Sequence, residues 1–185
     1  MTAAYGHGLS VSPVQFASAF AAMVNGGVLM HATLLKKMAG ERTVGVQVIS
    51  QRTSNQVRRL LRAVVEKGTG RRARAPGYLV GGKTGTAEKA SKGGYRGREL
   101  ISSFVAAFPM TAPKYVVYLF LDEPQGNAET HGNAGAGWTV APSIGRVVGR
   151  IAPILGVQPV DDQAAPVRRA MLMPLYTRKR KSAVN

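Results

Sequence analysis

Cysteine is absent from this chain of 185 residues, which excludes a disulfide framework and any thiol chemistry. Long apolar runs are absent too, since the longest, residues 115–121, is far short of the ~20 residues that a membrane-spanning helix needs. The residues after Met1 have neither a basic start nor an apolar segment, so no signal peptide is predicted. His7 and His131 have no acidic residue or histidine at metal-ligand spacing nearby, so they are predicted loop residues, and neither a metal nor a cofactor is expected.

Acidic residues are scarce: 9 Asp and Glu stand against 25 Lys and Arg, for a net charge of +16. Such a surface attracts polyanions such as nucleic acid, anionic lipid or acidic polymers. The positive charges are dispersed except at residues 71–74 and 178–181. Neither aromatic interleaving nor a zinc-finger or homeodomain pattern accompanies them, so no specific nucleic-acid partner is expected. A generally basic surface and a basic nucleic-acid-binding module both stay open.

The first half of the chain predicts two helices around a short strand. Ser12 is a predicted N-cap before Pro13, and an apolar set at helical spacing follows (Val14, Ala17, Ala21 and Val24). A strand is predicted over residues 44–49. Ser50 then caps a second helix with one apolar stripe, Val57, Leu60, Leu61, Val64 and Val65, and with Arg58, Arg59 and Arg62 on the other face.

The second half predicts three strands and a last helix. The strands are residues 78–88, 100–108 and 114–121, joined by Gly-, Lys- and Pro-rich turns typical of hairpins. A glycine-rich loop, residues 126–137, precedes the last helix, where Trp138 is expected to pack, and Asp122 and Glu123 are predicted to face water. The apolar stripe of this helix is Val140, Ile144, Val147, Val148, Ile151 and Leu155. The order of elements predicts an α+β fold, an antiparallel sheet with flanking helices, over residues 1–158, and a basic tail without fixed structure over residues 159–185.

The chemistry concentrates at residues 81–86, Gly-Gly-Lys-Thr-Gly-Thr, and two mechanisms fit this motif. Residues Gly77 to Thr84 satisfy the phosphate-loop pattern G-x-x-x-x-G-K-[ST], and Asp122 ends a strand like the one that holds Mg²⁺ in P-loop NTPases. A phosphate loop, however, must leave an apolar strand and open a helix. An Arg-rich segment precedes Gly77 and no amphipathic helix follows Thr84, so the NTPase is the weaker alternative.

The other interpretation places the motif on a strand. Lys83 then projects as a cation beside the hydroxyls of Thr84 and Thr86, and Gly85 leaves the backbone open to a substrate. The backbone N–H of Thr86 can contribute to an oxyanion hole. Such an arrangement suits an acyl substrate that ends in a carboxylate, although Lys-Thr-Gly alone is a weak signal.

The neighbourhood of the motif resembles the class B penicillin-binding proteins. Residues 5–15, Tyr-Gly-His-Gly-Leu-Ser-Val-Ser-Pro-Val-Gln, are similar to the stretch after the second catalytic motif of that family, and residues 75–87 are similar to its third motif. Residues 94–95, 102–109, 116–125 and 141–142 resemble the strands, turn and helix that follow. The likeness covers residues 3–158 in the family's order and looks closest to the septal, division-specific branch.

This resemblance implies a penicillin-binding or serine β-lactamase-like transpeptidase fold and a role in cross-linking peptidoglycan stem peptides. It assigns catalysis to Lys83, Thr84 and Gly85, substrate binding to Thr84 and Thr86, and half an oxyanion hole to the Thr86 N–H. The implied partners are the stem peptide, β-lactams and membrane proteins of the division complex. The intact family member is expected at the periplasmic face of the cytoplasmic membrane.

The family pattern also needs Ser-x-x-Lys and Ser-x-Asn. No serine of this chain has lysine three residues on or asparagine two residues on. Only the Lys-Thr-Gly edge is therefore transferred from the family, and the chain is expected to be the C-terminal part of the domain, inactive without its N-terminal part.

Overall fold

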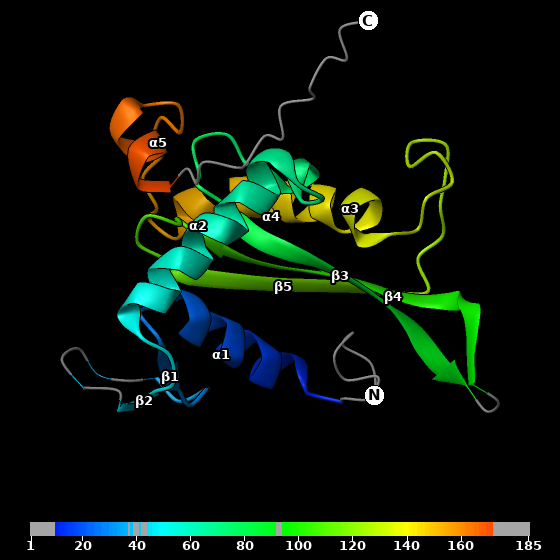
Figure 1. Cartoon of the computed structure of the whole chain (residues 1–185), viewed down its shortest axis with the longest axis horizontal. Helices are drawn as coiled ribbons and strands as arrows, with labels where there is room; N and C mark the ends of the chain where they lie inside the picture. The colour runs from blue at the N-terminus through cyan, green and yellow to red at the C-terminus, as the bar shows by residue number, and fades with distance from the viewer. Residues whose placement is uncertain (1–9, 37, 39–40, 42–43, 92–93, 172–185) are drawn as a thin grey trace, which may run out of the picture.

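The computed structural model describes residues 10–36, 38, 41, 44–91 and 94–171. Its main sheet has three antiparallel strands in the order β3 (Gly81–Ser91), β4 (Gly94–Phe108) and β5 (Tyr115–Asp122) (Figure 1). The central strand β4 starts six residues earlier than predicted, because the hairpin with β3 is longer. Strand β3 starts at Gly81 and not at residue 78, because Tyr78 turns back to donate its N–H to the Ala75 carbonyl.

The two faces of β4 pack against different helices, as the alternation of side chains along a strand requires. Phe104, Ala106 and Phe108 belong to a core with α4 (Ala141–Ile154). The intervening residues Val105 and Ala107 belong to a second core, which they share with residues of α1 (Pro13–Val24). Figure 1 shows α4 and α1 on opposite sides of the sheet. The predicted α+β architecture of an antiparallel sheet with flanking helices is confirmed.

Helix α1 has the predicted start but buries a different face. The Ser12 side chain accepts a hydrogen bond from the Gln15 N–H, which completes a capping box before Pro13. The residues of α1 that reach the core are Phe20, Ala22 and Val24. Val14, by contrast, is 60% exposed, so the predicted stripe is wrong at its first member.

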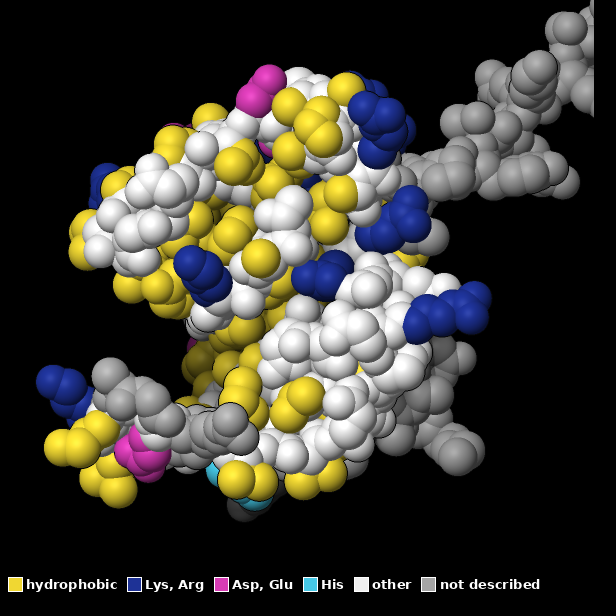
Figure 2. Space-filling view, turned by 90° about the vertical axis from the view of Figure 1, so that its left-hand side faces the viewer, with side chains coloured by type: hydrophobic (Ala, Val, Ile, Leu, Met, Phe, Trp, Pro, Cys, Tyr) yellow, Lys and Arg dark blue, Asp and Glu magenta, His cyan; other side chains and the backbone are white. Residues whose placement is uncertain are grey.

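That exposed side of α1 borders an apolar groove. The groove has a volume of about 430 Å³ and is lined by Pro13, Val14, Ala17, Ser18, Ala21, Ala32 and Tyr118. Figure 2 shows apolar side chains exposed in a hollow of the surface. The short strands β1 (Val28–Met30) and β2 (Gly45–Gln47) follow α1 in the chain. These two strands form a separate antiparallel pair, of which only β2 was predicted.

Helix α2 (Gln51–Lys67) begins at the predicted cap Ser50 and buries Leu61 and Val65. Arg62, which the pattern places on the solvent face, is only 2% exposed. Its guanidinium donates to the Val80 carbonyl at 2.9 Å and forms ion pairs with Glu66 at 2.6 Å and Asp162 at 3.0 Å. The side chain therefore ties α2 to the segment that enters β3 and to the segment that follows α4.

The predicted unstructured tail differs from the structure over its first part. Residues Ala165–Met171 form helix α5, which places Met171 and Val167 against the core that contains Leu61. The apolar contacts of this helix with that core come from Val167 and Met171, too few to form an apolar stripe that the sequence would show. Residues 172–185, including the basic run 178–181, lie outside the described residues.

Candidate active site edge

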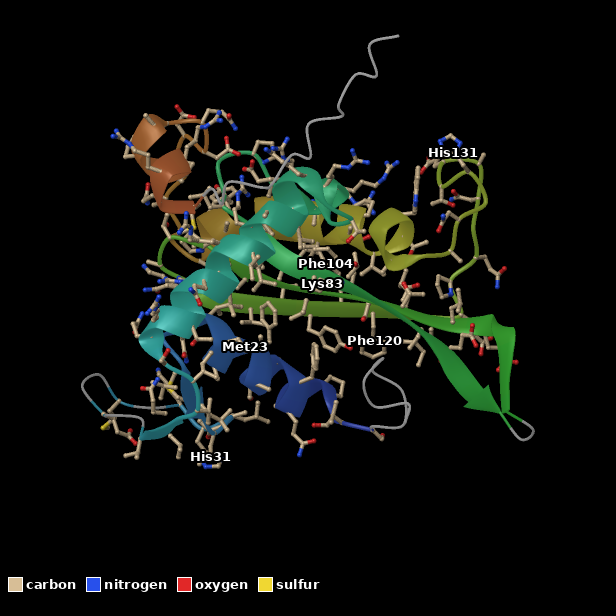
Figure 3. All side chains as sticks on the ribbon, viewed as in Figure 1. Met23, His31, Lys83, Phe104, Phe120 and His131 are labelled. Carbon is tan, nitrogen blue, oxygen red and sulfur yellow. The ribbon has the colours of Figure 1, made fainter. Side chains whose placement is uncertain are left out.

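Strand β3 carries the Lys-Thr-Gly-Thr motif on an edge of the sheet. Lys83 pairs with Val105 and Thr84 with Phe104 of β4, and β4 is the only strand paired with β3 among the described residues. Figure 3 shows Lys83 in the middle of the molecule, on the strand. The predicted strand placement of the motif is confirmed. The P-loop alternative is wrong, because Thr84 lies inside a strand and does not open a helix.

Asp122, the residue that the NTPase alternative assigned to Mg²⁺, has another partner. It ends β5 and forms an ion pair with Lys89 at 3.0 Å, and Glu123 pairs with the same ammonium at 2.6 Å. The hydrogen bonds to Glu123 and Asp122 raise the pKa of Lys89 above its ordinary value. Both carboxylates are exposed, as predicted, and the pairing joins the ends of β3 and β5. The described residues contain no cluster of three or more metal-ligating side chains.

Close packing on β4 fixes the backbone of the motif. A Cβ atom at Gly82 would lie 2.3 Å from the Val105 carbonyl oxygen and 2.4 Å from a ring carbon of Phe104. A Cβ atom at Gly85 would lie 2.7 Å from the Ser103 hydroxyl. Sequence reasoning gave Gly85 an open backbone for substrate, and the structure adds that a side chain there would collide with the neighbouring strand.

Lys83 folds along the open edge of the strand. Its ammonium donates to the Thr84 carbonyl at 2.8 Å and lies 3.4 Å from the Thr84 hydroxyl. The side chain is exposed. The cation therefore sits beside the threonine that follows it and is held by a backbone carbonyl.

Two threonine hydroxyls of the motif contact segments from elsewhere in the chain. Thr84 Oγ1 lies 2.9 Å from Thr69 Oγ1, and Thr86 Oγ1 accepts the Ala136 N–H at 3.2 Å. A hydroxyl has one donor and two acceptor sites. Because Thr86 uses an acceptor site on Ala136, its O–H is left to donate to another group.

These hydroxyls open into a pocket of about 370 Å³. Its walls come from the end of α2, from the short helices η2 (Arg71–Ala73) and α3 (Ala136–Thr139), and from β3. The lining residues are Gly68, Thr69, Arg71, Arg72, Thr84, Thr86, Gly135, Ala136, Gly137 and Trp138. The volume is in the range of small-ligand pockets. Lys83 is not among the residues that line this pocket, and it reaches the pocket only through its neighbour Thr84.

Of the residues that line this pocket, sequence reasoning assigned only Thr84 and Thr86 to the site. Thr69 carried no signal in the sequence, and Arg71 and Arg72 were noted only as part of a basic run. Trp138, expected to pack at the start of the last helix, lies in the separate helix α3, with the Arg72 guanidinium carbon 3.8 Å from its ring centroid and the edge-on ring of His131 at 5.4 Å. His131 has a positive φ of 51° in the predicted loop. His7 lies outside the described residues.

The chain matches the penicillin binding protein transpeptidase domain over residues 1–142. It belongs to that transpeptidase family. It is 43% identical over 163 residues to the probable peptidoglycan D,D-transpeptidase FtsI of Caulobacter vibrioides, covering 83% of this chain and 28% of that protein. It is 40% identical over 172 residues to the stage V sporulation protein D of Bacillus subtilis, covering 88% of this chain and 26% of that protein.

Solved transpeptidase structures share the fold. The transpeptidase domain of Burkholderia pseudomallei penicillin-binding protein 3 superposes with a TM-score of 0.76 at 38% identity, over 86% of this chain and 47% of that one. The Mycobacterium tuberculosis penicillin-binding protein 3 complexed with ampicillin gives a TM-score of 0.70 at 28% identity, over 88% and 39%. The resemblance found in the sequence and the transpeptidase fold are both confirmed, and this transpeptidase chain spans about half or less of its relatives.

No helix among the described ranges of this transpeptidase chain is long and apolar enough to cross a bilayer.

Proposed function

We propose that this chain is the part of a peptidoglycan D,D-transpeptidase that receives the carboxylate end of a stem peptide. The observation that carries this proposal is the Lys-Thr-Gly-Thr motif on an edge strand, with both threonines lining one pocket, in a chain of the transpeptidase family. The whole protein would cross-link stem peptides during cell-wall synthesis and division.

Each motif residue has a distinct role in this proposal. The O–H groups of Thr84 and Thr86 donate to the terminal carboxylate, and the ammonium of Lys83, which lies 3.4 Å from the Thr84 hydroxyl, adds a charge-assisted contact. The N–H of Thr86 supplies half of the oxyanion hole on the open edge of β3. Gly85 keeps the backbone of the strand close to β4 and free of a side chain.

The nucleophile comes from another segment. A serine activated by a neighbouring lysine attacks the D-Ala-D-Ala carbonyl, the amide C–N bond breaks, and the leaving amine takes the proton. An amine of a second stem peptide then resolves the acyl-enzyme. β-Lactams acylate the same serine in the intact protein, and one structural relative is a complex with ampicillin.

The partner of this chain is therefore the rest of the transpeptidase domain. The exposed apolar groove beside α1, together with the unpaired edge of β5 among the described residues, offers the surface for it. The family implies that the intact protein lies at the periplasmic face of the cytoplasmic membrane and contacts membrane proteins of the division complex.

The test is reconstitution with the part of the Caulobacter relative that this chain does not match, in which the proposal places Ser-x-x-Lys and Ser-x-Asn. Fluorescent penicillin should label a serine of that segment only when this chain is present. Lys83→Ala should abolish or strongly reduce labelling, whereas Lys114→Ala, an exposed lysine outside the motif strand, should not. Labelling that does not need this chain, or that survives Lys83→Ala, would refute the proposal.

A further inference from the structure

We propose that Arg71 and Arg72 form an anion subsite beside the threonine hydroxyls and bind a second carboxylate of the same peptide. The inference rests on the proposed function, because it takes the terminal carboxylate to bind at Thr84 and Thr86. It defines the substrate class more narrowly, as a peptide with an acidic group in addition to its C-terminus.

The first observation is that the arginines and the hydroxyls line one pocket. Arg71 and Arg72 follow directly on the Gly-Thr-Gly turn whose Thr69 contacts Thr84. A ligand held at Thr84 and Thr86 therefore extends into a cavity of about 370 Å³ with two guanidinium groups on its wall.

The second observation is that these arginines have no acidic partner. Over the described ranges of the chain, no carboxylate oxygen lies within 4.0 Å of either guanidinium, and the ion pairs involve Arg62 and Lys89. Both side chains are exposed to the pocket and to water. Their hydrogen-bond donors are thus available to a ligand.

The third observation is that the arginine wall is held in place. The guanidinium carbon of Arg72 lies 3.8 Å from the centroid of the Trp138 ring, a cation–π contact that restrains the position of the guanidinium. A Cβ at Gly137 would lie 2.8 Å from the Thr69 carbonyl oxygen, and one at Gly70 would lie 3.1 Å from the Phe104 ring. The turn and α3 therefore pack too closely to separate easily.

A carboxylate is the ligand group that fits these features. Guanidinium binds carboxylate through two parallel N–H···O bonds, and fixing the guanidinium in advance lowers the entropy lost on binding. The hydroxyls of Thr84 and Thr86 line the same pocket and bind the terminal carboxylate. The two groups of donors together favour a diacid over a monoacid.

The test uses matched synthetic peptides on the full chain. The probes are D-alanyl-D-alanine carrying a succinyl, glutaryl or adipoyl group on its amino end, each compared with its own methyl half-ester, which lacks the second charge. Trp138 is the single tryptophan of the chain and lies in the pocket, so its fluorescence and its indole N–H resonance report binding without any enzymatic activity.

We expect at least one diacid to bind about three- to five-fold more tightly than its half-ester at low salt, the range of a partly exposed ion pair. The ratio of the dissociation constants of the half-ester and the diacid should fall towards one in high salt. Arg71→Gln, which replaces an exposed guanidinium by a neutral amide, should reduce the preference for the diacid by itself. Arg72→Gln should reduce this preference further. Arg150→Gln, an exposed arginine of α4 outside the pocket, should leave it unchanged.

The outcomes separate this inference from the proposed function. Equal binding of every diacid and its half-ester would overturn the arginine subsite and leave carboxylate recognition by the threonines standing. A diacid preference that survives Arg71→Gln and Arg72→Gln would also overturn it. Failure of all the peptides to bind would overturn both.

Discussion

Replacing the buried arginine of α2 should destabilise the fold more than any other charge removal. Arg62→Met keeps most of the volume of the side chain but removes its hydrogen bond to the Val80 carbonyl and its ion pairs with Glu66 and Asp162. Removing one partner of a buried ion pair costs about 3–5 kcal/mol. The side chains of Glu66 and Asp162 are 15% and 33% exposed and regain water, so the lower limit, about 3 kcal/mol, applies.

The partners of Arg62 should matter less. Asp162→Asn leaves the Glu66 pair and the Val80 contact in place, so we expect a loss of about 1 kcal/mol or less. Arg52→Met, at an exposed position near the start of the same helix, is the matched control and should change stability by less than about 0.5 kcal/mol.

Urea and thermal denaturation followed by circular dichroism measure these differences. For a chain of this size, about 1 kcal/mol shifts Tm by about 2–4 °C, so Arg62→Met should lower Tm by about 6–12 °C. Hydrogen exchange should also accelerate at the entry to β3, which Arg62 holds through Val80. If Arg62→Met and Arg52→Met lower the free energy of unfolding by the same amount, the buried contacts of Arg62 contribute nothing to stability and the reasoning is refuted.

Three further predictions concern the motif strand and its surroundings. Gly82→Ala should lower the free energy of unfolding in urea several times more than Gly85→Ala. The added Cβ at position 82 meets the backbone of β4, whereas the one at position 85 meets a hydroxyl that can rotate away. Equal losses for the two variants would contradict this. Because hydrogen bonds to Glu123 and Asp122 raise the pKa of Lys89, the stability it contributes is complete below the ordinary lysine value and is lost as pH rises through the folded-state pKa. The difference between wild type and Lys89→Met in urea denaturation should therefore be constant from about pH 7 to 9 and shrink above about pH 10.4, and a difference that shrinks already near neutral pH would refute the pairing. Finally, the chain alone should form no covalent adduct with penicillin. A mass increase of one drug molecule in intact-mass spectrometry, lost on mutating one serine, would show that the chain does contain a nucleophile and contradict the prediction.

The sequence predicted those elements whose local signals and packing agree. Ser50 and the spacing of Leu61 and Val65 located α2, and Val140, Ile144 and Val148 gave the buried face of α4. Periodicity identifies an apolar face but not what covers it. Val14 of α1 is apolar and exposed, and Arg62 of α2 is charged and buried, because distant segments decide both.

The candidate site was only half visible in the sequence. Lys83, Thr84 and Thr86 follow from a contiguous motif, and their strand placement follows from the residues around it. The partners of the two hydroxyls, Thr69 and Ala136, lie 15 and 50 residues away, so only the folded chain brings them together. Helix α5 was missed for a related reason, since its residues Val167 and Met171 pack against a core that contains Leu61 of α2, far earlier in the chain.

The outer edge of β5 has a practical consequence for the isolated chain. Within the described ranges this strand pairs only with β4, and its sequence, Tyr-Val-Val-Tyr-Leu-Phe-Leu-Asp, contains neither proline nor a charge before its last residue. Phe120 and Leu121 near its end are 46% and 39% exposed. Native proteins blunt such edges with charges, bulges or a covering element, since an uncovered one templates edge-to-edge pairing between molecules. Aggregation at high protein concentration should therefore begin at β5, and a soluble preparation calls for dilute handling or a lysine placed on that strand.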